Sequence, residues 1–279
     1  MKVVIPIEQK SPAGQDAHLA EKKLAVNSTA RARRIRQSRI LFLLPKGEYR
    51  VTIKSKGNDS FGTKVLIRKV GEVMKSYIWF IVGGYLSGSV LFAYSIPKFM
   101  KHIDVCELSE DGNPGTYNAF KYGGFWCGVC VLLAELLKGF LPVWLCARTV
   151  GADRLPFAFV MASPVFGHAY SIFHHGRGGK AIAVSFGVML GILPEMRPLL
   201  LLIGCYLLFS LLVQVKDHRL RSVVTYVCFA AASILFIETP QIVLGDLLAA
   251  GVVIYRHTLG RPGEAALCAK NRRWLHRMR

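Results

Sequence analysis

Acidic residues are scarce in this chain. It has 17 aspartates and glutamates against 36 lysines and arginines in 279 residues, a formal net charge of +19. An excess of this size is common in nucleic-acid-binding proteins. Here the cations stand in short clusters between long apolar segments. The pattern therefore disfavours nucleic acid as a partner and favours a membrane protein that holds anionic lipid or phosphate.

The sequence also lacks a metal-binding framework and a secretory signal. Cys127 and Cys130 have CxxC spacing, but they lie in an apolar run, and no second pair or histidine stands at zinc spacing. We interpret all seven cysteines as packing or lipid-facing residues, and we expect no metal and no cofactor. From Lys2 to Arg39 the chain is polar and basic, without the apolar core of a secretory signal.

Long apolar segments dominate the chain from Tyr77 onward, with 52% hydrophobic residues and a mean hydropathy of +0.36 overall. A helix needs about 20 such residues to cross a bilayer. The sequence therefore predicts an all-α integral membrane protein, a helical bundle of seven spans. The expected spans are Tyr77–Pro97, Gly124–Val150, Leu155–Phe173, Ala181–Leu193, Pro198–Val215, Val223–Glu238 and Gln241–Tyr255.

The charges of the connecting segments predict the orientation of the bundle. With seven spans, the clusters around Lys98, Lys121, Lys180, Arg219 and the segment after Arg256 fall on one side. The more basic side of a membrane protein faces the cytoplasm. We therefore expect a multi-pass protein of the bacterial inner membrane, with its N-terminus outside and its C-terminus and active-site loops on the cytoplasmic face.

Residues 1–73 differ from the rest of the chain. Ala30 to Arg39 contains five arginines, and the expected orientation would put them on the outer side. Met74 directly precedes the first apolar span. Either Met74 is the natural start, or residues 1–73 are a genuine, largely disordered basic extension. We accordingly expect a membrane domain over residues 74–258 and a basic cytoplasmic tail over residues 259–279.

A glycine-rich basic loop, His174 to Lys180, separates two apolar segments. Gly178 and Gly179 leave backbone N–H groups accessible, and the start of the following helix adds its dipole. Arg177 and Lys180 supply full positive charges. The loop is therefore a candidate phosphate site at the membrane surface.

A second polar loop runs from Ser109 to Lys121 and contains Asn113, Gly115 and Asn118. Asn-Pro-Gly is a turn signal, so the segment could be a plain connection. Two asparagines and a lysine beside a membrane also suit hydrogen bonding to a polyol phosphate.

Ionisable residues inside or next to apolar segments are further candidates. Glu135 and Lys138 stand at i and i+3; such groups are functional candidates in a membrane, or else a helical ion pair with a snorkelling lysine. His168, close to the glycine loop, favours an active-site role over a structural one. Ser222 and the pair Arg256-His257 follow basic clusters that topology alone would also explain.

Taken in order, these motifs resemble those of the bacterial acyl-phosphate-dependent glycerol-3-phosphate acyltransferases, the PlsY family. The resemblance covers residues 74 to 257. It rests on Gly88-Ser89, Gly112-Asn113-Pro114-Gly115 with Asn118, Leu136-Leu137-Lys138-Gly139, Gly167-His168 with Gly178-Gly179-Lys180, and Ile254-Tyr255-Arg256-His257.

The resemblance implies transfer of a fatty acyl group from acyl phosphate to the sn-1 hydroxyl of glycerol 3-phosphate, without metal or cofactor. The expected partners are these two substrates and membrane lipid, and we expect a monomer. The implied catalytic residues are His168, Lys180 and His257. The implied substrate-binding residues are Asn113, Gly115, Asn118, Lys121, Lys138, Arg177, Gly178, Gly179, Ser222 and Arg256. A different polyol phosphate acceptor, a small anion or lipid-phosphate transporter, and an inactive homologue are the alternatives.

The chain departs from the family pattern at several positions. Asp111 stands where the family has serine, and it would repel phosphate unless it binds a hydroxyl or pairs with a cation. Lys121 replaces an arginine and loses the bidentate fork. The other departures are Glu135, Arg177, Ala181 and Val184, together with a single serine, Ser222, where the family has two.

Overall fold

The structure is a computed structural model that describes residues 60–109 and 111–258. Its contacts divide the chain into one unit of residues 1–76 with 153–155 and a second of residues 77–152 with 156–279. The first unit contributes the N-terminal part of one long helix. The second unit contains the other described helices.

All regular structure in the described residues is helical, which confirms the predicted all-α class. The helices are α2 Ser60–Ser89, α3 Phe92–Lys101, α4 Val105–Leu108, α5 Thr116–Gly123, α6 Phe125–Thr149, α7 Phe157–Ala169, η1 Ile172–His174, α8 Ile182–Gly191, α9 Arg197–Leu207, η2 Leu208–Leu212, α10 His218–Phe236 and α11 Pro240–Thr258.

Several predicted spans coincide with helices and others are divided. The prediction Gly124–Val150 matches α6 closely, whereas Tyr77–Pro97 is interrupted between α2 and α3. The polar loop from Ser109 contains a short helix, α5, because Phe120 packs on Gly128 of α6. Of the predicted extension 1–73, residues 60–73 belong to α2; the remainder, and the tail 259–279, lie outside the described residues.

Three described segments are long and apolar enough to cross a membrane: Gly71–Lys101, Phe125–Thr149 and His218–Phe236. Ile182–Gly191 and Arg197–Leu212 are shorter apolar helices. Large apolar side chains such as Trp79, Leu212 and Leu235 are more than 70% exposed. Exposed apolar surface on this scale is costly in water, so these faces suit contact with lipid.

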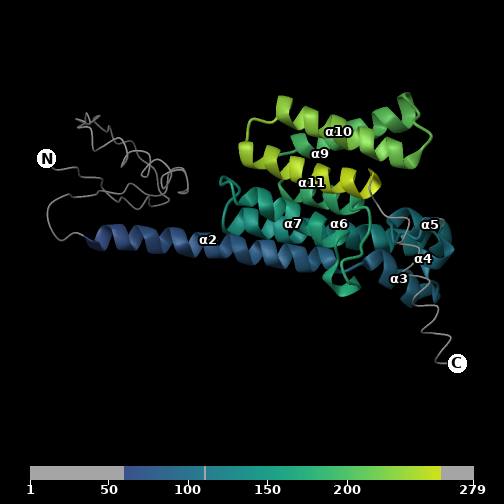
Figure 1. Ribbon diagram of the computed structural model, residues 1–279, viewed down its shortest axis with the longest axis horizontal. Helices are drawn as coiled ribbons and strands as arrows, with labels where there is room; N and C mark the ends of the chain where they lie inside the picture. The colour runs from purple at the N-terminus through teal and green to yellow at the C-terminus, as the bar shows by residue number, and fades with distance from the viewer. Residues whose placement is uncertain (1–59, 110, 259–279) are drawn as a thin grey trace. The chain divides into compact units, whose positions relative to one another are not determined.

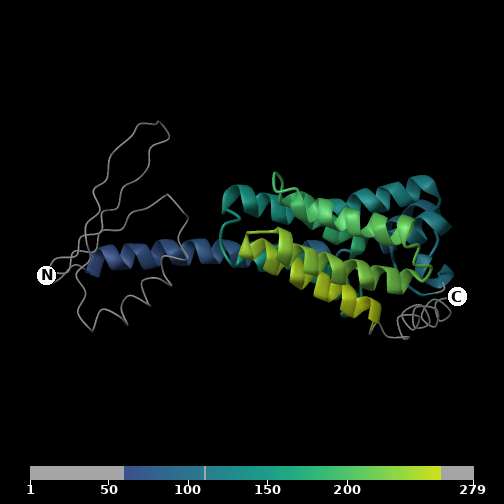
Figure 2. The same ribbon diagram turned by 90° about the horizontal axis from the view of Figure 1, so that it is seen from above.

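The core of the second unit is built from closely packed helix pairs. α6 packs along α8, and α11 lies between α7 and α10 (Figures 1 and 2). Gly139 of α6 lies against the backbone of Val184, and Gly187 of α8 lies against that of Leu136. Small residues let helix backbones approach closely where lipid removes the hydrophobic driving force.

Glycines also allow α2 and α7 to pack closely against each other. A β-carbon on Gly88 would clash with the backbone carbonyl of Pro164, and one on Gly167 would clash with that of Tyr85. The two glycines therefore face each other's helices. This contact fixes the end of α2 beside the end of α7, where His168 lies.

This contact predicts that Gly88→Val destabilises the bundle. The added side chain meets backbone, which cannot rotate away, and overpacking of this kind costs about 1–3 kcal/mol. Thermal unfolding in detergent should show a lower midpoint. Gly83→Ala, in the same helix with nothing within 4 Å of the added carbon, is the control. Equal midpoints for the two variants would contradict the prediction.

Candidate active site

A cavity of about 890 Å³ opens at one end of the bundle. Its walls come from the loop before α5, from α5 itself, from the N-terminal turns of α8 and α10, and from the end of α11. Polar and charged residues form one part of the lining. Leu132, Phe186 and Tyr206 form an apolar part next to it.

The loop before α5 is organised by Asp111. Its Oδ1 accepts hydrogen bonds from the side-chain amide of Asn118, at 3.1 Å, and from the backbone N–H of Asn113, at 3.3 Å. The Asn118 amide also donates to the Asn113 carbonyl at 2.8 Å. Gly115 leaves room for the Asn113 side chain. Asn113 Oδ1 is buried and has no hydrogen-bond partner in the described part of the chain.

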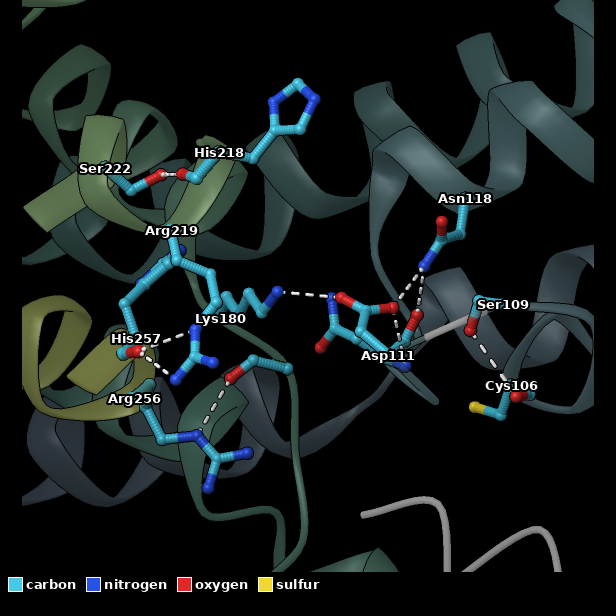
Figure 3. A network of polar contacts seen from close by, with 12 residues as sticks. Cys106, Ser109, Asp111, Asn118, Lys180, His218, Arg219, Ser222, Arg256 and His257 are labelled. Carbon is cyan, nitrogen blue, oxygen red and sulfur yellow. Dashed lines mark hydrogen bonds and ion pairs between the residues drawn. The ribbon is translucent and has the colours of Figure 1, made fainter. Parts of the chain in front are cut away.

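Asp111 also pairs with Lys180 across the cavity. Lys180 Nζ donates to Asp111 Oδ2 at 2.7 Å, and Figure 3 shows the lysine side chain extended toward the carboxylate. Burial raises the pKa of Asp111, but the hydrogen bond and charge of Lys180, with the bonds from Asn118 and Asn113, outweigh it and hold that pKa below its usual value. The carboxyl is therefore ionised near neutral pH.

The glycine loop is held from behind by Arg256. Its guanidinium donates to the carbonyls of Gly178 and Gly179, at 2.7 Å and 3.3 Å, and lies 5.6 Å from the centre of the Tyr170 ring. The Gly179 N–H donates to the carbonyl of His168 at 3.0 Å. The loop carbonyls thus point at Arg256, which fixes the path of the chain into Lys180.

Ala181, the N-cap of α8, has a left-handed backbone with φ 60°. A β-carbon in that conformation costs about 1–2 kcal/mol. Glycine avoids this cost, which gives a physical reason for glycine at this position in the family pattern. The N-terminal turn of α8 lines the cavity, and the first N–H groups of a helix have no intrahelical partner, so this turn suits an anion.

Beneath the cavity lies a buried charge cluster of Glu135, Lys138 and His168. Glu135 Oε2 is 2.7 Å from Lys138 Nζ and 3.0 Å from His168 Nδ1. Lys138 also donates to the Val90 carbonyl at 2.6 Å, and Glu135 accepts from the Ala93 N–H at 3.2 Å. The pair thus satisfies backbone groups left without intrahelical partners at the break between α2 and α3.

The N-terminus of α10 supplies the remaining cations. Asp217 caps this helix by accepting from the N–H groups of Arg219 and Leu220, and these hydrogen bonds lower the pKa of its carboxyl. The Arg219 guanidinium donates to the His257 carbonyl at 3.0 Å and 3.3 Å, which ties α10 to the end of α11 (Figure 3). Arg221 contacts the His218 ring.

A family model described as glycerol-3-phosphate acyltransferase matches residues 78–260, well over half of the chain. The chain belongs to this family.

Individual relatives agree with the assignment. The chain is 38% identical over 185 residues to glycerol-3-phosphate acyltransferase 2 of a Bacillus cereus strain, covering 66% of this chain and 89% of that protein. It is 30% identical over 177 residues to the glycerol-3-phosphate acyltransferase of Shewanella woodyi, covering 63% and 84%.

A solved structure has the same fold. It is PlsY (YgiH), an integral membrane glycerol 3-phosphate acyltransferase, in its glycerol 3-phosphate form. The TM-score is 0.58 at 25% identity, with 66% of this chain and 90% of that chain covered. The resemblance to the PlsY family drawn from the motifs is therefore confirmed, and the fold is that of an integral membrane protein.

The structure brings many of the predicted site residues of this acyltransferase family member to one cavity. Those that line it are Asn113, Gly115, Asn118, Lys121, His168, Lys180, Ser222 and His257. The other predicted residues lie behind or beside it: Gly178, Gly179 and Arg256 in the loop contact, Lys138 in the buried cluster, and Arg177, which is partly buried.

Some residues that line the cavity are not among the site residues predicted from the sequence. Lys216, Arg219 and Arg221 line the cavity, whereas the sequence left their cluster open between a topology signal and a functional loop and predicted only Ser222 as a site residue. Leu132, Phe186 and Tyr206 carry no signal in the sequence beyond apolarity, because apolar residues are everywhere in these segments.

The buried cluster predicts a large destabilisation for Glu135→Gln. The change leaves the Lys138 ammonium buried without its counter-charge, and breaking a buried pair costs about 3–5 kcal/mol. The unfolding midpoint in detergent should fall clearly. Lys138→Met in the Glu135→Gln background should recover part of the loss because the uncompensated ammonium is gone. A double variant less stable than Glu135→Gln would contradict this account.

Proposed function

We propose that this protein transfers a fatty acyl group from acyl phosphate to the sn-1 hydroxyl of glycerol 3-phosphate and releases lysophosphatidic acid and phosphate. Family membership supports the reaction class. The names of the Bacillus and Shewanella relatives give glycerol 3-phosphate as acceptor, and PlsY was solved in its glycerol 3-phosphate form.

The observation that carries the proposal is the charge of the cavity. Lys121, Lys180, Lys216, Arg219 and Arg221 line it. The acidic residues of the lining are Asp111, Glu135 and Asp217, and each is already paired or caps a helix. An excess of cations around one enclosed volume suits two phosphate-bearing substrates held together. The adjacent apolar lining suits an acyl chain.

The chemistry demands little beyond this arrangement. Acyl phosphate is an activated mixed anhydride, so the enzyme must mainly gather two anions and align a hydroxyl with a carbonyl. Lys180 and the N-terminal turn of α8 would stabilise the phosphate and the charge that develops on the carbonyl oxygen. Asn113 Oδ1, buried without a partner among the described groups, would accept a hydrogen bond from a glycerol hydroxyl.

The remaining predicted residues would shape the site or contact the acceptor. His168 contacts Glu135 and Lys138 through Nδ1, and it would hold the floor of the cavity. Gly178, Gly179 and Arg256 would set the shape of the phosphate loop. Ser222, whose hydroxyl donates to the His218 carbonyl at 3.0 Å, and His257 would contact the acceptor from the α10–α11 side.

We also propose the membrane arrangement. Seven spans would cross the bacterial inner membrane, with the N-terminus outside and the cavity facing the cytoplasm, as a monomer. The arrangement is supported by the basic segments of α5, α8, α10 and α11, which meet at the one cavity. The short helices α7 and α8 would span with help from their neighbours, by tilt or burial in the bundle.

The first test is acyl transfer by the purified full-length chain and by residues 74–279. Each is mixed with palmitoyl phosphate and labelled glycerol 3-phosphate in detergent. We expect labelled lysophosphatidic acid from both. A folded full-length protein that makes none would contradict the proposed reaction. Product from the long form alone would contradict the proposal that residues 1–73 are dispensable.

Lys180→Met should lower the rate of transfer by about 10²- to 10³-fold, the usual loss when one preorganised charge-stabilising donor is removed. Lys98→Met is the matched control, since this lysine on α3 lies outside the cavity lining and contacts the Tyr94 hydroxyl. Size-exclusion profiles verify folding of both variants. Similar rates for the two would show that Lys180 does not act on the substrates.

A further inference from the structure

A carboxylate stands inside a cavity proposed to take two anions. Asp111 pairs with Lys180 at 2.7 Å, and its side chain is 45% exposed to the cavity and its mouth. An acid at this point weakens phosphate binding at Lys180 through like-charge repulsion. A carboxylate here therefore lowers the affinity for phosphate, and a positive role in substrate binding or catalysis would offset that loss.

The carboxylate is fixed while its partner is free to move. Asp111 Oδ1 is held by Asn118 and by the Asn113 N–H, so that Oδ2 is presented to Lys180 (Figure 3). Lys180 has a long flexible stem that can turn to a bound phosphate. A phosphate that entered the cavity would therefore attract the lysine, while the hydrogen bonds to Oδ1 would hold Asp111 in place.

The departure of Lys180 makes the carboxylate more basic. Burial raises the pKa of Asp111, whereas Lys180 lowers it by a hydrogen bond and by its charge. Once the ammonium turns to phosphate, the effect of burial is left against weaker opposition. Asp111 thereby gains proton affinity when both substrates are in place.

Two other proton acceptors of the lining, His168 and His257, are less available. His168 is 5% exposed, and its Nδ1 lies against Glu135 and Lys138. His257 is 3% exposed, and its Nδ1 is 2.8 Å from the Val253 carbonyl. Of these three groups, Asp111 is the one open to a substrate hydroxyl.

We propose that Asp111 is a catalytic residue that accepts the proton of the acceptor hydroxyl. The inference rests on the proposed acyl transfer. The O–H bond breaks as the hydroxyl oxygen bonds to the acyl carbonyl carbon, and the proton passes to Asp111 Oδ2. The bond from that carbon to the phosphate oxygen then breaks, and the leaving phosphate takes the proton from Asp111. Lys180 donates to the phosphate throughout.

This role also orients the acceptor. The acceptor phosphate avoids the carboxylate and binds toward the cations of the α10 turn, Arg219 and Arg221, while its hydroxyl end faces Asp111. A carboxylate at this position thus selects a substrate with a hydroxyl donor at one end and an anion at the other.

The test is steady-state kinetics of Asp111→Asn in the full-length protein. Asparagine keeps the size and can still accept from Asn118 and Asn113, but it is no longer a base. We expect kcat to fall about 10²- to 10⁴-fold, the usual contribution of general base catalysis. KM should stay the same or fall, because the change also removes the repulsion between Asp111 and the substrate phosphate. A lower KM with kcat retained would overturn the proposal, because Asp111 would then be only a competitor of phosphate.

Chemical rescue separates catalysis from folding. In Asp111→Gly, added formate should restore transfer in proportion to its concentration, because the small carboxylate can occupy the vacated space. It should not restore Asp111→Asn, where that space is filled. Glu107→Gln, at an exposed carboxylate on the same segment outside the cavity, is the control and should keep wild-type rates. Absence of rescue in folded Asp111→Gly would overturn the proposal.

Failure of this inference is distinguishable from failure of the proposed function. If the wild-type protein makes no lysophosphatidic acid, the proposed reaction fails, and with it the step assigned to Asp111. If the wild type is active and Asp111→Asn is equally active, the reaction stands and the role of Asp111 alone is wrong.

Discussion

The rest of the site depends on the ionic contact between Glu135 and Lys138. Removing two charges from water is costly, and the cost is recovered here by short distances and by two backbone partners, Val90 and Ala93. These two backbone groups lie at the break between α2 and α3, where they lack intrahelical partners. Inside lipid there is no water to form hydrogen bonds with such groups. The pair therefore stabilises the interruption of the helix at this point, and His168 links it to α7.

The chain after the break builds one wall of the cavity. α3, α4 and α5 follow the break, and Asp111 and α5 line the cavity together with the N-terminal turns of α8 and α10. Arg256 works from the opposite side by holding the glycine loop against α11. The walls of the cavity are thus supported by a polar framework, of which Glu135 and His168 also line the cavity.

Much of this architecture could be predicted from the sequence, because long apolar segments that cross a membrane are restricted to helices. The match of α6 to Gly124–Val150 follows from length and apolarity alone. The motifs locate Asn113, Lys180 and His257 because glycines, basic residues and interrupted apolar runs stand out against lipid-facing segments. The interruption of the first span at Val90 could not be predicted, since the Val90 carbonyl is bound by Lys138, which lies 48 residues away in the sequence.

The directions in which side chains point also could not be predicted from the sequence. The resemblance implies that Arg256 binds substrate, but the sequence does not indicate that it binds the carbonyls of the glycine loop and lies outside the cavity lining. It leaves open whether Asp111 meets a hydroxyl or a cation, and the structure gives the cation Lys180. It leaves Arg219 and Arg221 open between topology and function, because a basic cluster after a span has the same sequence pattern whether it lines a cavity or faces water.

The glycine contact between α6 and α8 has a consequence for how such a chain can diverge. Gly139 and Gly187 each lie against the backbone of the opposite helix, and neither faces a side chain that could shrink to make room. A larger residue at one position therefore has no compensating substitution at the other. Only backbone faces these glycines, so side chains elsewhere on the two helices can still change, as Glu135 on α6 and Val184 on α8 do relative to the family pattern.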